Sequence, residues 1–198
     1  MEKVLKHFKK RLKEYDNIFI NNASFKSRAI GVGVVSPEEC VKNGYVGQVL
    51  RGCGIKADVR KDAPYLVYDK LDFEVPIAQG GDVYARALVR RAEMDQSIHI
   101  LEQVIAKMPE GEIMVKMPTH RKFKLPKDDT WVKVESSRGE FAYYMAGDGS
   151  EKIRRMQVRG PSLVHGFTLL EDLLVGAELS DVALIMNSLG ICPPEIER

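Results

Sequence analysis

The sequence has 198 residues and a mass of 22.3 kDa, with 44% hydrophobic and 29% charged residues. This composition fits one globular domain, or two small ones, and excludes a largely disordered chain. No apolar run reaches the roughly 18 to 20 residues that cross a bilayer, and the N-terminus is too charged for a signal peptide. Three scattered cysteines favour a reducing compartment, so we expect a cytoplasmic chain without a transmembrane segment.

The net charge of +2 conceals opposite charges at the two ends of the chain. Residues 1–28 carry eight Lys or Arg against three acids, whereas residues 166–198 carry six acids against one arginine. A basic end can meet nucleic acid, an anionic membrane surface or an acidic partner, and it can also be a solvated helix face. The basic stretch lacks interleaved aromatic residues, so no nucleic-acid partner is predicted.

The first part of the chain predicts two helices joined through a strand. Residues 2–20 predict an amphipathic helix, because apolar residues recur there at spacings of three and four. A short strand is expected over 31–35. Ser36, followed by a proline and two acids, predicts a capped helix that ends near Gly44.

The middle of the chain contains the strongest helix signal. A helical patch over 46–51 precedes a glycine-rich loop over 52–65, and partial alternation predicts extended chain or an edge strand over 65–75. Asp82 is a good N-cap for the long apolar stripe of 83–108, which Pro109 ends.

After a connection over 109–129, three segments rich in β-branched and aromatic residues predict a small antiparallel sheet: 131–135, 140–146 and 152–159. A turn at 147–150 joins the last two segments. Two helices over 163–175 and 181–189 follow, the second capped by Ser180, and the double proline at 193–194 is expected to forbid further helix.

These elements predict an α+β fold, mainly a helical bundle with a long central helix and a small antiparallel sheet. We expect a single domain over 1–198. It would be helical over 1–109, with a β insertion at about 130–160 and C-terminal helices over 163–189.

Few residues stand out as candidates for catalysis, ligand binding or metal binding. No glycine loop or histidine pair has the spacing of a nucleotide or zinc site. On the long helix, Arg86, Arg90, Glu93 and Ser97 share one face, where they either hold a partner's carboxylate or pair internally. Glu135, Arg138 and Glu140 surround a strand turn that serves proton transfer if it is buried, or is a plain turn. Cys192 before two prolines is either a rigidly presented metal ligand or an inert thiol.

Taken together, several motifs along the chain have a recognisable pattern. The first motifs are Leu50-Arg51-Gly52-Cys53-Gly54-Ile55, Asp58-Val59-Arg60-Lys61, Leu71-Asp72-Phe73-Glu74-Val75-Pro76 and Gly80-Gly81-Asp82-Val83-Tyr84. The later ones are the row Arg86, Arg90, Glu93, Met94, Ser97, then Glu135, Arg138-Gly139-Glu140, Tyr143-Tyr144 and Pro161-Ser162. The pattern resembles the hydrogenase-like large subunit of respiratory complex I and the related large subunits of membrane-bound nickel-iron hydrogenases and sulfane reductases.

The resemblance implies a [NiFe]-hydrogenase large-subunit-like fold and an NADH-quinone oxidoreductase function, with quinone and NAD binding in the complex. It covers only the C-terminal half of such subunits. The segment that supplies the quinone-holding histidine and tyrosine is absent, and a split subunit, a truncated remnant and a fragment all stay open. As part of such a large subunit, the chain is expected to be inactive alone and to form one wall of a quinone-like substrate cavity.

The implied partners are a small iron-sulfur subunit with its cluster, the N-terminal half of the large subunit, and membrane arm subunits, at the cytoplasmic side of the membrane. The chain alone is expected to bind no cofactor. Relatives with a nickel-iron centre end in two cysteines and an arginine, and here Cys192, Glu195 and Arg198 align with these positions. One ligand of four does not make a nickel-iron centre, so we expect Cys192, Glu195 and Arg198 near the cavity floor. A non-catalytic structural remnant is the alternative.

Overall fold

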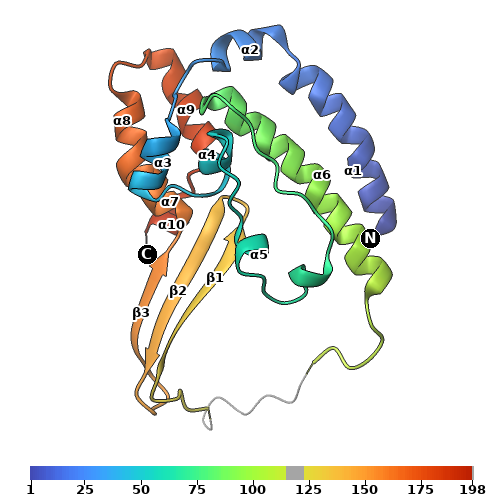
Figure 1. The fold of residues 1–198 in the computed structure, drawn as a ribbon, viewed down its shortest axis with the longest axis vertical. Coiled ribbons are helices and arrows are strands. Elements are labelled where there is room, and N and C mark those ends of the chain that lie inside the picture. The colour runs from blue at the N-terminus through green and yellow to red at the C-terminus, as the bar shows by residue number, and fades with distance from the viewer. Residues whose placement is uncertain (115–122, 198) are drawn as a thin grey trace.

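The computed structural model describes residues 1–114 and 123–197. The N-terminal part begins with α1 (Glu2–Tyr15), which continues as a π-helical turn over Asp16–Ile20. The helices that follow before the sheet are α2 (Ala23–Ala29), α3 (Pro37–Asn43), α4 (Gly47–Gly52), α5 (Val59–Asp62) and α6 (Val83–Lys107). The long α6 crosses the body of the molecule diagonally, with α1 beside it (Figure 1).

A three-stranded antiparallel sheet follows α6, in the order β1-β2-β3. Its strands are β1 (Asp129–Ser136), β2 (Gly139–Gly147) and β3 (Ile153–Arg159). Glu135 pairs with Glu140 across the first hairpin, and the β2–β3 register shifts at Ala146/Gly147. The first hairpin turn points back toward the helices, so this sheet delivers residues 135–140 to α4 (Figure 1).

The C-terminal helices pack beside α3 and α4. They are α7 (Pro161–Val164), a π-helical turn over His165–Leu169, α8 (Leu170–Leu174), a 3-10 turn over Leu179–Asp181, α9 (Val182–Leu189) and α10 (Pro193–Ile196). None of the helices within 1–114 and 123–197 is long and apolar enough to cross a membrane.

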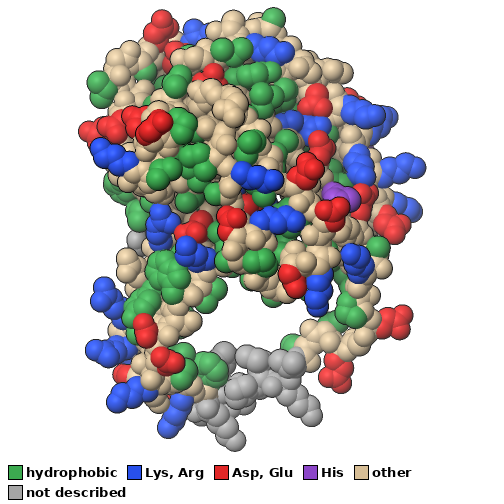
Figure 2. Space-filling model, in the orientation of Figure 1, with side chains coloured by type: hydrophobic (Ala, Val, Ile, Leu, Met, Phe, Trp, Pro, Cys, Tyr) green, Lys and Arg blue, Asp and Glu red, His purple; other side chains and the backbone are tan. Residues whose placement is uncertain are grey.

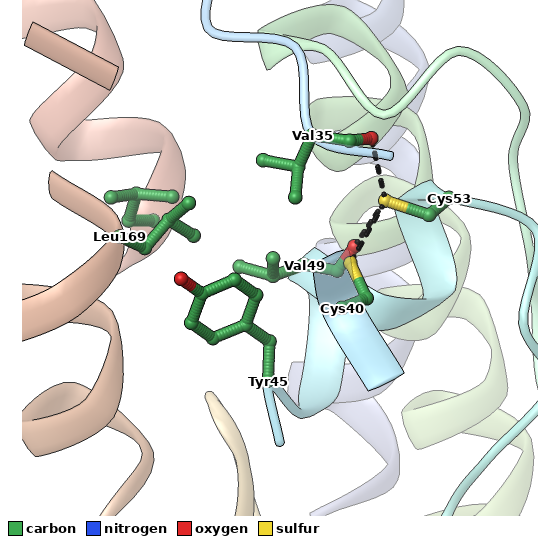
Figure 3. Packing of buried hydrophobic residues seen from close by; sticks show 7 residues of the cluster. Val35, Cys40, Tyr45, Val49, Cys53 and Leu169 are labelled. Atoms are coloured by element: carbon green, nitrogen blue, oxygen red, sulfur yellow. Dashed lines mark hydrogen bonds between the residues drawn. The ribbon is translucent and has the colours of Figure 1, made fainter. Parts of the chain in front are cut away.

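One hydrophobic cluster joins the two halves of the chain. It contains Val35, Cys40, Tyr45, Val49 and Cys53 from the N-terminal half and Leu169 and Leu189 from the C-terminal half. Figure 3 shows these side chains meeting between α4 and the C-terminal helices. Burying such side chains stabilises the fold by about 1.5 to 3 kcal/mol each, so this cluster fixes α4 relative to α9.

The helix over 83–108, the capped helix after Ser36 and the three strands are confirmed. Ser36 and Glu39 form a capping box, and the carboxylate of Asp82 accepts from the backbone N–H of Ala85. Gly44 ends its helix in the left-handed conformation. These features depend on neighbours within a few residues, which is why the sequence pattern was sufficient.

Other expectations were wrong. Residues 31–35 form no strand, because Gly31 and Gly33 have positive φ and the backbone N–H of Gly31 donates to the carboxylate of Asp82. The edge strand over 65–75 is not formed, because a 3-10 turn spans Tyr68–Lys70; the alternative, extended chain, fits Leu71, whose backbone is extended. The helix α2, capped by Asn22, was not expected, and α5 lies within the predicted loop over 52–65.

Two expectations at the C-terminus were also wrong. Ser180 does not cap α9, because a 3-10 turn precedes that helix and the Ser180 hydroxyl accepts from Arg28 instead. The double proline does not forbid helix, since Pro193 occupies the first position of α10, where its missing N–H is not needed.

Candidate functional site

A cavity of about 730 Å³ lies between α4, α6, the β1–β2 hairpin and the segment after α9. One part of its wall is apolar, with Leu5, Phe8, Met94, Ile98, Leu101 and Ile191. The other part is charged, with Arg51, Arg60, Arg90, Glu93, Glu135 and Arg138. A cavity with one apolar and one charged part suits a ligand that has an apolar body and a polar end.

Arg51 is the centre of the charged part. It belongs to α4, and its side chain is only 2% exposed. Its Nη1 lies 2.9 Å from Glu135 Oε1 and donates to the Ala57 carbonyl, while its Nη2 lies 2.6 Å from Glu93 Oε1. A guanidinium presents its N–H groups in a fixed fork, so one arginine holds both carboxylates in place.

Glu135 is held through both its side chain and its backbone. Its Oε2 accepts from the backbone N–H of Val59 at 3.1 Å, and its own backbone N–H donates to the hydroxyl of Tyr65 at 3.1 Å. Burial raises the pKa of Glu135 above its ordinary value, and the charge of Arg51 opposes this. Burial likewise raises the pKa of Glu93, again opposed by Arg51. Both carboxyl groups therefore hold a proton more readily than exposed ones.

Asp58 and Arg60 extend the charged cluster, and Arg60 itself lines the cavity. Asp58 is buried, caps α5, and accepts from Arg60 Nε at 2.9 Å and Nη2 at 2.7 Å. Arg51 Nη1 lies 3.8 Å from Asp58 Oδ2. The buried positive and negative groups thus form one connected network, which is needed because an isolated buried charge is strongly unfavourable.

Two further arginines, Arg90 and Arg138, also line the cavity. Arg90 donates to the Ser188 carbonyl at 3.0 Å. It also donates to the side-chain oxygen of Gln48 at 2.8 Å, in the amide orientation that lets the Gln48 nitrogen donate to the Ser137 carbonyl. Burial lowers the pKa of Arg90. Arg138 donates from Nε to the Gly190 carbonyl at 2.6 Å. Their remaining N–H capacity is available to an anionic or carbonyl oxygen.

The hairpin that carries Arg138 approaches α4 at the backbone level. Gly47 has φ +64°, and a Cβ there would lie 2.0 Å from the Arg138 carbonyl oxygen. Only glycine fits this position, since it tolerates positive φ and has no side chain. The close approach brings Glu135 and Arg138 to the same wall as Arg51.

The expected row along α6 pairs within the chain, which is one of the two alternatives, and its partners lie on other segments. Whether it also holds a partner's carboxylate stays a prediction. Arg86 is fully buried and donates to the carbonyls of Gly81 and Gly33 and to the Ser188 hydroxyl. Glu93 pairs with Arg51 of α4, not with an arginine of its own helix. The row therefore joins α6 to three other segments.

Four of the sequence-predicted site residues come together on the cavity: Arg90, Glu93, Glu135 and Arg138. Glu140 instead pairs with Lys133 at 3.0 Å and Arg159 at 3.2 Å. Among the described residues, Cys192 and Glu195 are not part of the lining, and Arg198 lies outside the described residues.

Glu195 and Cys192 organise the C-terminal segment. Glu195 is buried, and its Oε1 accepts from the backbone N–H of Ser162 at 2.7 Å, while its Oε2 lies 3.9 Å from Arg138 Nη1. The half-buried Cys192 donates its backbone N–H to the Ser162 hydroxyl at 3.1 Å. Glu195 thus contacts a residue that lines the cavity, and Cys192 directly follows Ile191, which also lines it. The functional role of both residues stays a prediction.

Sequence reasoning did not single out Arg51, Asp58 and Arg60 as site residues. Their local signal was the pair of motifs Leu50–Ile55 and Asp58–Lys61, which carried the family resemblance only. Arg51 pairs with a residue 84 positions away, and such a partner cannot be inferred from local spacing.

The residues present do not fit a nickel-iron centre. Within 1–114 and 123–197, no group of three or more His, Cys, Asp or Glu side chains is arranged to hold a metal ion. Cys40 and Cys53 lie together in the hydrophobic cluster, whereas Cys192 lies beside Ser162. The thiolates that such a centre requires are not gathered at one place.

Comparisons with known proteins agree with this architecture. A family model described as "Respiratory-chain NADH dehydrogenase, 49 Kd subunit" matches residues 1–198. The chain is 37% identical over 196 residues to an NADH-quinone oxidoreductase subunit of Thermosipho melanesiensis, covering 98% of this chain and 53% of that protein. It is 39% identical over 191 residues to an NADH-quinone oxidoreductase subunit of Roseiflexus sp., covering 93% and 51%.

A solved structure is similar over the whole chain. A chain from the membrane-bound sulfane sulfur reductase, an archaeal respiratory membrane complex, superposes with a TM-score of 0.93 at 40% identity, covering 100% of this chain and 54% of that chain. The present chain thus spans about half the length of the relatives it matches. From the family match and these likenesses, the chain belongs to the family of the 49 kDa subunit of respiratory-chain NADH dehydrogenase.

Proposed function

We propose that this chain is part of the catalytic large subunit of a membrane-associated, multi-subunit oxidoreductase of the complex I type. It forms one wall of the cavity for a quinone-like substrate, next to a small iron-sulfur subunit. The observation that carries the proposal is the cavity itself, in which Arg51 pairs with two largely buried carboxylates, Glu93 and Glu135, and which apolar side chains also line. Family membership supplies the reaction class.

The charged wall suits the reduction of a quinone, which takes up two electrons and two protons at its oxygen atoms. Glu93 and Glu135 have pKa values raised by burial, so they can hold and deliver protons near the cavity. Arg90 and Arg138 orient a carbonyl or anionic oxygen through N–H groups. Electrons come from the cluster of the partner subunit, and no step requires a metal on this chain.

The further partners are the remaining part of the large subunit and the membrane arm subunits, which place the chain peripherally at the cytoplasmic side of the membrane. Cys192, Glu195 and Arg198 lie near the cavity floor in this proposal. The contact between Glu195 and Arg138 supports that placement, because Arg138 lines the cavity.

Native purification tests the assignment. The tagged chain is isolated from its own membranes, and the proteins that accompany it are identified by mass spectrometry. We expect a small iron-sulfur subunit, a polypeptide that supplies the other half of the large subunit, and membrane subunits. Isolation of the chain without an iron-sulfur protein, under conditions that keep membrane complexes intact, would contradict the proposal.

A sulfane sulfur reductase is the second candidate, because the 40% identity and the TM-score of 0.93 are found with such a complex. Cys192 directly follows Ile191, which lines the cavity, so its thiol is the candidate for sulfur chemistry in this second function. The purified complex is assayed with a short-chain quinone and with a polysulfide as alternative electron acceptors. Reduction of quinone alone supports the first function, and reduction of polysulfide alone supports the second.

A further inference from the structure

Two cysteine thiols lie in contact inside the hydrophobic cluster. Cys40 belongs to α3, Cys53 is the C-cap residue of α4, and their Sγ atoms are 3.2 Å apart. Their exposed fractions are 0% and 5%. Neither thiol lines the cavity or takes part in the charged network around Arg51, so the proposed chemistry of the cavity does not account for the pair.

The surroundings leave the two sulfur atoms facing each other. Cys53 Sγ lies 3.2 Å from the Val35 carbonyl and 3.2 Å from the Val49 carbonyl (Figure 3). The other neighbours are apolar side chains of the same cluster. Each sulfur therefore has the other as the one reactive group in contact with it among the described residues.

The local backbone can accommodate a bond between them. A disulfide has an S–S distance of about 2.05 Å, so the two sulfur atoms need to approach each other by about 1 Å. Cys53 stands between Gly52 and Gly54, and Gly54 has φ +85°. Residues without side chains on both sides allow Cys53 to shift with little steric resistance.

We propose that Cys40 and Cys53 form an oxidisable dithiol, which closes to a disulfide when hydrogen peroxide reaches the core. One thiolate sulfur attacks a peroxide oxygen, the O–O bond breaks, and a sulfenic acid and hydroxide form. The second sulfur then attacks the sulfenic sulfur and displaces its hydroxyl group, so two thiols and one peroxide give one disulfide and two waters. Peroxide is close to water in size and enters through local opening, whereas a glutathione-sized disulfide does not fit a core this closely packed.

The disulfide would act on the helix that carries the cavity arginine. Cys53 is two residues beyond Arg51, and the Arg51 carbonyl accepts from the backbone N–H groups of Ala78 and Gly54. Oxidation ties this end of α4 to α3. It also closes the loop between residues 40 and 53. This restricts the unfolded chain and raises the melting temperature of the protein, by about 6 to 12 °C for a loop of this length.

Mass mapping of the wild-type chain, isolated with whatever partners accompany it, tests the proposal. The sample is treated with hydrogen peroxide, denatured in the presence of N-ethylmaleimide, and digested with trypsin. We expect the peptide 29–42 to be linked to the peptide 52–56, with the loss of two hydrogen atoms and release of both peptides by a phosphine. Cys192 serves as the internal control, because it is half-exposed and should appear in no peptide linked to Cys40 or Cys53.

A matched variant separates the disulfide from general oxidation. Cys53→Ser keeps a hydrogen-bond donor for the Val35 or Val49 carbonyl but cannot form the bond. Peroxide should raise the melting temperature of the wild type and leave that of Cys53→Ser unchanged. Two results would overturn the proposal. One is complete alkylation of Cys40 and Cys53 after a peroxide treatment that oxidises Cys192, and the other is their conversion to sulfinic or sulfonic acids without a linked peptide. The mapping uses the wild-type chain, so it does not depend on a variant that folds.

Discussion

At the scale of single residues, the candidate site depends on Arg51. Its guanidinium neutralises Glu93 and Glu135 in surroundings where a carboxylate without a partner would be strongly unfavourable. The same contacts set the proton affinity of the two acids, because burial raises their pKa values and Arg51 limits the increase. Stability and proposed chemistry therefore depend on the same side chain.

Replacing Arg51 tests this dependence. Arg51→Met keeps much of the side-chain volume but leaves Glu93 and Glu135 without their shared partner, so the free energy of unfolding should fall by about 3 to 5 kcal/mol. Arg154→Met, at an exposed arginine of β3, should change it by less than about 0.5 kcal/mol. Urea unfolding of the three chains provides the comparison. Equal stabilities of the two variants would show that Arg51 does not hold the cluster.

Glu93 should make stability depend on pH in a defined direction. Its folded pKa is raised above the unfolded value, so the folded state binds more protons between these two values, and stability falls as pH rises through that window. Glu93→Gln mimics the protonated acid, so its stability should not fall with rising pH in this way. The stability of wild type minus that of Glu93→Gln should decrease as pH rises above 4.5. A difference that increases with pH would mean that Arg51 outweighs burial.

His165 should have the opposite pH dependence. It is fully buried, and burial lowers its pKa to about 4. Between this value and the unfolded pKa near 6.5, only the unfolded chain is protonated, so acidification destabilises the fold, by up to about 3 kcal/mol at pH 4. His165→Gln retains an acceptor for the Val46 N–H and should remove this component. Parallel pH profiles of the two chains would refute the assignment.

At the scale of elements, the meeting of α4 and the β1–β2 hairpin assembles the cavity wall. Gly47→Ala should cost at least about 2 kcal/mol more than Gly176→Ala. Both positions have positive φ, but a Cβ at Gly47 strikes the Arg138 carbonyl, and a Cβ at Gly176 meets nothing within 4 Å. Denaturant unfolding measures the difference. Equal losses of stability in the two variants would show that the positive φ alone, and not the contact with the Arg138 carbonyl, requires glycine at position 47.

Elements specified by near neighbours could be predicted from the sequence, and elements specified by distant partners could not. The caps at Ser36 and Asp82 use hydrogen bonds to residues three positions away. In contrast, Gly31 is positioned by a carboxylate 51 residues away, so the strand predicted over 31–35 is not formed. The segment 65–75 likewise packs through the Tyr65 hydroxyl onto β1, without a strand partner.

The candidate site was predictable to a similar extent. Glu93 and Glu135 belong to charged groups that are conspicuous in the sequence, and the structure brings them together. Arg51 follows an apolar residue at the end of a short helix, a position where an arginine is usually solvated. Its burial is created by α6 and β1 together, which no local pattern reveals.

At the scale of the whole molecule, the two ends of opposite charge meet other parts of the fold. In the N-terminal part, Lys9 pairs with Glu102 of α6 and Arg28 with Asp181 near α9. The surface view shows basic and acidic side chains interspersed over the body (Figure 2). The basic end is thus partly used in packing, as expected of an amphipathic helix over residues 2–20.

The most direct test of the catalytic role is turnover of the intact membrane complex that carries Glu135→Gln, compared with the wild type and with Glu102→Gln. Glu102 is an exposed acid that pairs with Lys9, so its replacement controls for the loss of a charge. Glu135→Gln should lower kcat at least about tenfold, as expected when a proton-transfer group is lost, with the subunit composition unchanged. Wild-type turnover by Glu135→Gln would contradict the account and identify the chain as a structural component of its complex.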